Sequence, residues 1–422
     1  MLYRSVEVYV PPDTSIQGPT IVIANHFGGF ADALLVVYAL DDVPRILARD
    51  KIWKIPLVRG LMRAIRAIPV HKPEDRTEPT SNRDMFGATY DALAHNDTIL
   101  IFPEGITVDD PSMARLKTGA ARIALGARAH GVEGITIVPI GIHYEDKAAL
   151  RSRVSVIVGD AMDLDDPPTA TGSPEEGMTP ENRRLVRTLT ARMEERLRNV
   201  APNFADWKEA NDLTFAAEAT IRAEHADPLA PVSTAERDRL AGKLAVAEAG
   251  ARRRVIEAVE RYRRDLEAVG LTDRQAHHRT STVEFALHVA ATVLVGAILI
   301  PFALIGIATS AVPLFVVLGI GLLPVSPAVK ATLKPVAAIV LFPLAWGIAA
   351  WRIVFDNLGP VWTFVTVALI PLYLVAGIVI TERLVLLWRA FEAWHGRKGL
   401  STATARISYE RARVVEAVRA AT

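Results

Sequence analysis

The chain has 422 residues, no cysteine, and 48 Lys and Arg against 47 Asp and Glu, which gives a net charge of +1. The absence of cysteine excludes disulfides, thiolate metal sites and a cysteine nucleophile, and the balanced charge gives no basic excess of the kind that favours nucleic acid. Half of the residues are hydrophobic, and the mean hydropathy of +0.23 is high for a soluble enzyme. The apolar residues are concentrated in the second half, because Lys330 and Lys334 are the only charged residues between Phe285 and Trp351.

The first notable stretch is 20–34, which reads TIVIANHFGGFADAL. The alternating residues 5–10 predict one strand before it, and 21–24 predict a second, buried strand that leads through Asn25-His26 into a turn on Gly28 and Gly29. Asp32 then begins a predicted helix over 32–40. Imidazole titrates near neutral pH, so His26 is a candidate base and Asp32 could hold its ring and stabilise the imidazolium. Alternatively, His26 is only a strand-end residue that hydrogen-bonds a carboxylate, and the stretch alone leaves both interpretations open.

The segment 45–71 mixes basic residues with bulky apolar ones, among them Trp53. A helix on an anionic membrane surface needs both, because its apolar face enters the lipid and its cations attract the headgroups. The alternative is an ordinary amphipathic helix with a solvated basic face. The end of the segment, 68–72, predicts a short strand. The basic residues are Arg45, Arg49, Lys51, Lys54, Arg59, Arg63 and Arg66.

The next part of the chain alternates helical and strand patterns up to about residue 160. Helices are predicted over 84–95 and 115–129, and strands over 98–102, 135–142 and 153–158. The strand 98–102 runs into Pro103-Glu104-Gly105. The pattern predicts an α/β domain with a mixed sheet flanked by helices, and such sheets usually bind ligands beyond the carboxyl ends of their strands.

Two charged helices are predicted after this domain. The first has Thr179 as its cap and Pro180 at its first position, and it continues through 183–198. The second begins at Ser233, three residues before Glu236, and extends to about Glu267. We interpret the charged runs as solvated helix faces that connect the α/β domain to a membrane region.

Four apolar stretches follow, at 285–307, 309–324, 333–354 and 361–381. A helix needs about 20 residues to cross the hydrocarbon core, so 309–324 is short and either crosses or forms a re-entrant segment. Four crossings would place every basic segment on one side and the loop 355–360, which carries Asp356, on the other. The predicted division is therefore 1–165 as the α/β domain, 166–280 as a helical extension and linker, 281–382 as a region of about four spans, and 383–422 as a basic tail.

The localisation follows from the same charges and from the N-terminus. The first residues lack the long apolar core of a secretory signal, which favours a cytoplasmic first half. With an even number of crossings, both ends are cytoplasmic. We therefore expect an integral protein of the plasma or inner membrane, with the α/β domain and the C-terminus in the cytoplasm.

Four ordered blocks resemble the glycerolipid acyltransferase family, which includes the glycerol-3-phosphate and 1-acylglycerol-3-phosphate acyltransferases. The similarity covers about residues 1–160, and the apolar tail resembles the membrane region of a fungal-like subset of that family. The blocks are Asn25-His26 with Asp32, Ile68-Pro69-Val70-His71-Lys72, Phe102-Pro103-Glu104-Gly105 and Val138-Pro139-Ile140-Gly141.

The resemblance implies that His26 is the general base on an acceptor hydroxyl, which attacks the thioester of acyl-CoA or acyl carrier protein, and that Asp32 orients the imidazole. It requires neither a metal nor a cofactor. Backbone N–H groups around Gly28 and Gly29 could stabilise the oxyanion. The implied partners are a lipid bilayer, the acyl donor, and a glycerol phosphate or lysophospholipid acceptor, without nucleic acid.

The remaining predicted substrate-binding residues lie in the same blocks or close to them. Five residues separate His26 from Asp32 where most members have four. The second block has Lys72, with Arg76 nearby, where an Arg usually holds phosphate, and FPEG continues as Ile106-Thr107-Val108-Asp109 instead of a Thr-Arg or Ser-His pair. The phosphate contact could therefore fall to the residues before the helix 115–129. The full predicted set is Asn25, Gly28, Gly29, Lys72, Arg76, Phe102, Pro103, Glu104, Gly105, Arg115, Lys117 and Pro139.

Other functions fit the sequence less well. A Ser-His-Asp hydrolase would need a G-x-S-x-G elbow, which does not occur. The histidines at 71, 95, 130 and 143 lack metal-ligand spacing with acidic partners. Two alternatives stay open: a lysophospholipid-remodelling acyltransferase with a bulkier acceptor, and an inactive membrane scaffold that retains the fold. The sequence leaves open the sn-position, the acyl length, the choice of donor and the oligomeric state.

Overall fold

The computed structural model forms two compact units, which are described separately. The first comprises Met1–Thr214, Ser233–Ala247 and Ser326–Ala331, and the second Phe215–Val232, Glu248–Val325 and Thr332–Thr422. The structure describes residues 3–12, 18–40, 42–50, 53, 56–70, 83–164, 179–225, 231–277, 281–352, 356–395 and 401–422.

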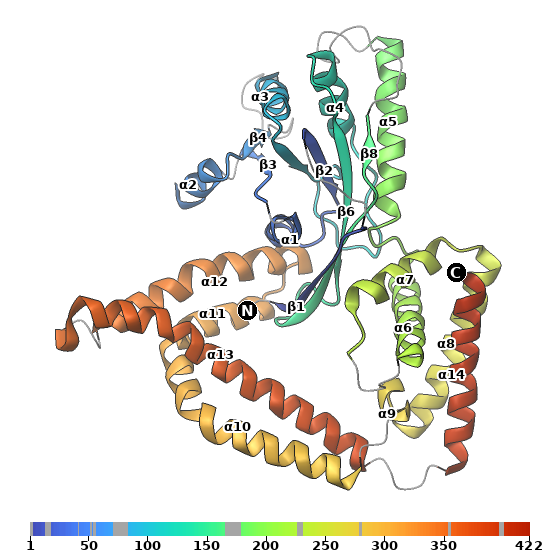
Figure 1. The fold of residues 1–422 in the computed structure, drawn as a ribbon, viewed down its shortest axis with the longest axis vertical. Coiled ribbons are helices and arrows are strands. Elements are labelled where there is room, and N and C mark those ends of the chain that lie inside the picture. The colour runs from blue at the N-terminus through green and yellow to red at the C-terminus, as the bar shows by residue number, and fades with distance from the viewer. Residues whose placement is uncertain are drawn as a thin grey trace. The chain divides into compact units, whose positions relative to one another are not determined.

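The centre of the first unit is an eight-stranded mixed sheet (Figure 1). Its strands are β1 Tyr3–Tyr9, β2 Thr20–Ala24, β3 Arg45–Arg49, β4 Ile68–Val70, β5 Thr98–Ile101, β6 Thr136–Tyr144, β7 Ser152–Val158 and β8 Met162–Asp163. The order is β1-β7-β6-β2-β5-β3-β4, and β8 pairs with β6. Because β2 is parallel to both β5 and β6, the carboxyl ends of these three strands meet at one edge. The antiparallel pairing of β7 with β6 makes the sheet mixed, as the sequence predicts.

Helices cover both faces of this sheet. They are α1 Phe30–Leu40, α3 Arg83–Ala94, α4 Gly119–Ala129, α5 Pro180–Arg198 and α7 Thr234–Val246; α2 Pro56–Ala64 lies in the connection between β3 and β4. Side chains alternate along β2, because successive residues of a strand point to opposite faces. Ile21 and Ile23 pack into a core shared with α3, α4 and α5, whereas Val22 and Ala24 pack into a second core with α1. The strand that leads to His26 is therefore buried on both sides.

Two sequence predictions in this unit are wrong. Residues 45–49 form β3, paired with β4 and β5, rather than part of a surface helix. Among the described residues of 45–71, α2 is the one α-helix, and its position on a membrane stays a prediction. The helix predicted over 115–129 begins at Gly119, because the backbone before it folds back onto the start of its own connection: Lys117 N–H donates to the Pro103 carbonyl at 2.8 Å.

The charged helix predicted from Ser233 to about Glu267 is two helices. Ser233 caps α7 by accepting from Glu236 N–H at 3.2 Å, as predicted, but α7 ends at Val246 and α8 Ala249–Val269 follows. The interpretation of its charges as solvated is wrong for two residues. Arg237 and Asp238 are 5% and 7% exposed, and Ser155 of β7 donates to Asp238 at 2.6 Å.

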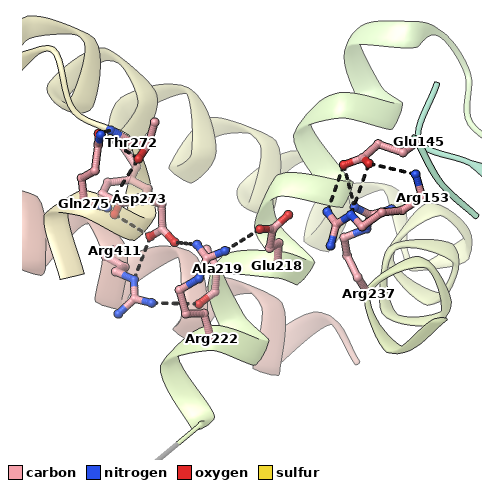
Figure 2. A network of polar contacts seen from close by, with 11 residues as sticks. Glu145, Arg153, Glu218, Ala219, Arg222, Arg237, Thr272, Asp273, Gln275 and Arg411 are labelled. Atoms are coloured by element: carbon pink, nitrogen blue, oxygen red, sulfur yellow. Dashed lines mark hydrogen bonds and ion pairs between the residues drawn. The ribbon is translucent and has the colours of Figure 1, made fainter. Parts of the chain in front are cut away.

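Helix α6 Trp207–Glu224, absent from the predictions, runs from the first unit into the second. The second unit also contains a group of packed helices: α8, α9 Asp273–His277 and α14 Ser401–Ala421. Figure 2 shows Arg222 of α6 and Arg411 of α14 converging on Asp273. Arg411 Nε donates to Asp273 Oδ1 at 2.9 Å, and Tyr262 of α8 donates to the same carboxylate at 2.7 Å. A single buried acid therefore ties four helices together.

The apolar helices are α10 Thr282–Thr309, α11 Ala311–Leu322, α12 Pro327–Ala350 and α13 Asp356–His395. Among the residues that the structure describes, three segments are long and apolar enough to cross a membrane: Thr282–Thr309, Pro327–Ala350 and Gly359–Glu392; α11 is shorter. The number of membrane spans, about four from the sequence, stays a prediction. Helices α10 and α13 lie side by side (Figure 1), and a Cβ at Gly306 would be 2.4 Å from the Tyr373 carbonyl carbon.

Candidate active site

His26 lies two residues beyond the carboxyl end of β2, at the edge where β5 and β6 also end. Its Nδ1 is 2.9 Å from Asp32 Oδ2, in the first turn of α1. A carboxylate only accepts hydrogen bonds, so Nδ1 carries the proton and Nε2 keeps its lone pair. The His26 side chain is 20% exposed and that of Asp32 is 0% exposed. The ring is therefore accessible while its acid is shielded from water, an arrangement suited to general base chemistry.

Asp32 is held from more than one side. Gly28 N–H lies 2.8 Å from Oδ2 and 3.0 Å from Oδ1, and the Tyr144 hydroxyl donates to Oδ1 at 2.6 Å. These hydrogen bonds replace the ones that the buried carboxylate would otherwise make with water. The predicted use of backbone N–H groups as oxyanion donors therefore fails for Gly28, whose N–H is engaged with Asp32. For Gly29 it stays a prediction.

Glu104 supports the loop that carries His26. Its Oε1 accepts from His26 N–H and its Oε2 from Ala114 N–H, both at 2.7 Å. Glu104 is 1% exposed, and this burial raises its pKa to about 7, although the two N–H donors act in the opposite direction. The side chain thus links the β2–α1 loop to two parts of the β5–α4 loop, and its charge changes close to neutral pH.

Phe102 and Asn25 surround the histidine in different ways. The Phe102 ring stacks on the imidazole with centroids 4.3 Å apart and planes at 23°. Asn25 is fully buried, and its amide exchanges two hydrogen bonds with the backbone of Ile142, at 3.1 and 2.7 Å. It therefore joins the end of β2 to β6, and any contact with substrate stays a prediction. Pro139 is buried within β6, opposite Ile23.

Lys117 lies against the FPEG turn. Gly105 has a φ of +65°, and a Cβ at this position would be 3.0 Å from Lys117 Nζ. Lys117 and Arg115 are both exposed, on the segment that connects β5 to α4. A cation is thus available beside Glu104 and Gly105. The other two predicted phosphate ligands, Lys72 and Arg76, lie outside the described residues.

Sequence reasoning missed Tyr144 and Tyr3. Tyr144 is the last residue of β6. Its hydroxyl donates to Asp32, and its ring lies against that of Tyr3, the first residue of β1, with centroids 6.0 Å apart. Burial raises the pKa of Tyr144 well above its usual value and that of Tyr3 to about 12. Tyr144 follows the fourth block at the end of a predicted strand, a position like that of His26, and this was the available signal.

Comparison with known proteins gives a consistent result for the N-terminal part. Residues 5–143 match the family model "Acyltransferase". Glycerol-3-phosphate O-acyltransferase 2 of Saccharomyces cerevisiae is 27% identical over 219 residues, which is 52% of this chain and 29% of the yeast protein. Glycerol-3-phosphate O-acyltransferase 1 of the same yeast is 37% identical over 81 residues, 19% of this chain and 11% of that protein. The matched part thus spans less than a third of either relative.

Among solved structures, the 1-acyl-sn-glycerophosphate (LPA) acyltransferase PlsC from Thermotoga maritima is similar at 19% identity, with a TM-score of 0.30. The match covers 46% of this chain and 73% of the Thermotoga chain. The resemblance drawn from the four sequence blocks is confirmed by the family model and the yeast relatives.

Proposed function

We propose that the chain, of which residues 5–143 match the acyltransferase family model, is a membrane O-acyltransferase of glycerolipid synthesis. The acyl chain moves from the thioester of acyl-CoA or acyl carrier protein to a hydroxyl of glycerol 3-phosphate or 1-acylglycerol 3-phosphate. The observation that carries the proposal is the pairing of an accessible imidazole with a buried carboxylate at the carboxyl end of β2.

The proposed reaction needs one base and no acyl-enzyme. His26 Nε2 takes the proton of the acceptor hydroxyl while the hydroxyl oxygen attacks the thioester carbonyl carbon. The tetrahedral intermediate collapses, the C–S bond breaks, and the leaving thiolate takes the proton back from His26. The products are the ester and the free thiol, and the imidazole returns to its starting state. Asp32 stabilises the imidazolium that exists between the two proton transfers, as the acid does in a catalytic triad.

A phosphate on the acceptor is supported by Lys117 and Arg115. Both are exposed cations just before the N-terminus of α4, where an anion is electrostatically favoured. Lys117 lies against Gly105, beside the loop that Glu104 connects to His26. The names of the two yeast relatives favour glycerol 3-phosphate as the acceptor.

A membrane location is supported by the three long apolar helices and by a connection from the site to α12. Val108 N–H donates to the His26 carbonyl at 2.9 Å. The next residue, Asp109, pairs with Lys147 at 2.6 Å and accepts from Ala328 N–H, in the first turn of α12, at 3.1 Å. An apolar helix thus starts against the loop that holds the proposed base, which suits an insoluble product.

The test is transfer of a labelled acyl group by the detergent-solubilised full chain. Glycerol 3-phosphate, 1-acylglycerol 3-phosphate and lysophosphatidylcholine are offered in turn, with acyl-CoA and with acyl carrier protein as donors. We expect transfer to a phosphate-bearing acceptor, and a loss of about 10²–10⁴-fold in His26→Ala because the base is removed.

The matched control is His95→Ala, an exposed histidine at the end of α3, which should transfer at the wild-type rate. Transfer to lysophosphatidylcholine alone would favour phospholipid remodelling. No transfer to any acceptor, or an equal rate in His26→Ala, would contradict the proposal and favour a scaffold.

A further inference from the structure

We propose that Tyr144 is a positioning residue for the general base, acting through Asp32. The proposal rests on the proposed function, because it assigns a role within the same site. The observation behind it is a continuous series of hydrogen bonds from Tyr144 through Asp32 to His26.

The contacts fix the direction of each hydrogen bond. A phenol hydroxyl has one proton, and that of Tyr144 is donated to Asp32 Oδ1 at 2.6 Å. Asp32 Oδ2 receives His26 Nδ1 at 2.9 Å, so the tyrosine and the histidine bind different oxygens of the same carboxylate. Tyr144 thereby prevents Asp32 from rotating away from the imidazole.

The packing around the Tyr144 hydroxyl is close. A Cβ at Gly28 would lie 2.2 Å from that oxygen and 2.8 Å from Asp32 Oδ1. Only a glycine can therefore occupy this position of the turn while Tyr144 reaches Asp32. Gly28 N–H also binds Asp32, so the turn, the acid and the tyrosine form one unit. The sheet supplies the geometry, because Tyr144 ends β6 directly beside β2.

The hydrogen bond from Tyr144 holds the Asp32 carboxylate where it can stabilise the imidazolium of His26. Without this bond, Asp32 is free to turn away from the ring and stabilises the protonated imidazole less. The other titratable groups that face this pair are Glu104, which accepts from His26 N–H, and Tyr3, whose ring lies against that of Tyr144.

The test compares Tyr144→Phe with wild type and with Tyr90→Phe, which alters a buried tyrosine of α3 in the same domain. The first readout is transfer kinetics. We expect kcat to fall by about 10–100-fold in Tyr144→Phe, the range found when partners of metal-binding side chains are removed. KM for the acyl donor should stay unchanged, because the proposed role of Tyr144 is to hold Asp32. Tyr90→Phe should retain both values.

The second readout does not need turnover. Diethyl pyrocarbonate modifies unprotonated imidazole, so the pH dependence of His26 modification, followed by peptide mass spectrometry, reports the protonation of His26. We expect the midpoint to move to lower pH in Tyr144→Phe, because Asp32 is no longer held beside the imidazole and stabilises the imidazolium less, and to stay in place in Tyr90→Phe.

An unchanged or raised midpoint in Tyr144→Phe, with kcat like that of Tyr90→Phe, would overturn the inference while leaving the proposed function intact. If the wild type transferred no acyl group, the proposed function would fail, and the midpoint would still show whether Tyr144 acts on the His26–Asp32 pair.

Discussion

Two buried acids lie beside His26 in different surroundings. Asp32 accepts from an imidazole, a phenol and a backbone N–H, whereas Glu104 accepts only from backbone N–H groups. Burial therefore prevails at Glu104 and raises its pKa to about 7. Glu104 therefore changes its charge, next to the proposed base, within the physiological pH range.

The raised pKa of Glu104 predicts a specific pH dependence of stability. Because the pKa rises from 4.5 to about 7 on folding, the folded chain binds more protons than the unfolded chain between these values. The stabilising contribution is complete below about pH 4.5 and is lost as the pH rises through about 7. Gln does not titrate, so the stability advantage of wild type over Glu104→Gln should shrink with rising pH.

Thermal unfolding of the solubilised chain between about pH 5 and pH 8 measures this advantage as a difference in Tm. Glu133→Gln, which replaces an exposed acid in the same domain, controls for the removal of a carboxylate. A difference for Glu104→Gln that stays constant or grows with pH would contradict the prediction.

The proximity of His26, Asp32 and Glu104 could be predicted from the sequence, because His26 and Glu104 directly follow two apolar strands and Asp32 begins the next helix. The role of Tyr144 could not be predicted. Its contact with Asp32 depends on the pairing of β6 with β2, across 112 positions of sequence, and no local pattern reports that register.

At the scale of elements, tertiary contacts override local pattern where the predictions fail. Arg45–Arg49 has the mixed basic and apolar character of an amphipathic helix, yet it fills a place in the sheet between β5 and β4. Ala114 and Lys117 have helical character, but their N–H groups bind Glu104 and Pro103 instead. The residues just before α4 are thus held by the site, which the sequence of the helix alone does not show.

The pairing of α10 with α13 gives the second prediction. Gly306 allows close approach, because a Cβ there would lie 2.4–2.6 Å from the Tyr373 and Leu374 backbone. Gly306→Val should therefore force the helices apart and lower the stability of the chain by about 1–3 kcal/mol, the usual cost of overpacking.

Gly296→Val is the matched control, because it lies in the same helix and its Cβ would meet only Ile300 Cδ1, at 3.8 Å. Both variants alter helix propensity equally, so the difference in their Tm values isolates the packing. Equal Tm values would contradict close packing at Gly306.

For the whole molecule, the contact of Asp109 with Ala328 constrains the path through a membrane. Ser326–Ala331 belongs to the same compact unit as the α/β domain, so α12 starts on the side of His26. If α10 leaves that side, α11 must return the chain to it. Yet α11, with 12 residues, is only about 18 Å long, against about 30 Å of hydrocarbon. The span lengths can be read from the sequence, but the contact of Asp109 with Ala328, which places the start of α12 on the side of His26, cannot.

The absence of cysteine makes a direct test possible, because any introduced cysteine is the only thiol in the chain. We predict that Glu133→Cys in the α/β domain and Thr422→Cys at the C-terminus react with a membrane-impermeant maleimide from the same side. Asp356→Cys, at the first residue of α13, should react only from the other side. Labelling of intact and inverted vesicles reads out each position. If α11 turns back within the lipid, the chain crosses three times. Asp356→Cys would then react on the same side as Glu133→Cys. Thr422→Cys would react on the opposite side, and this result would contradict four crossings.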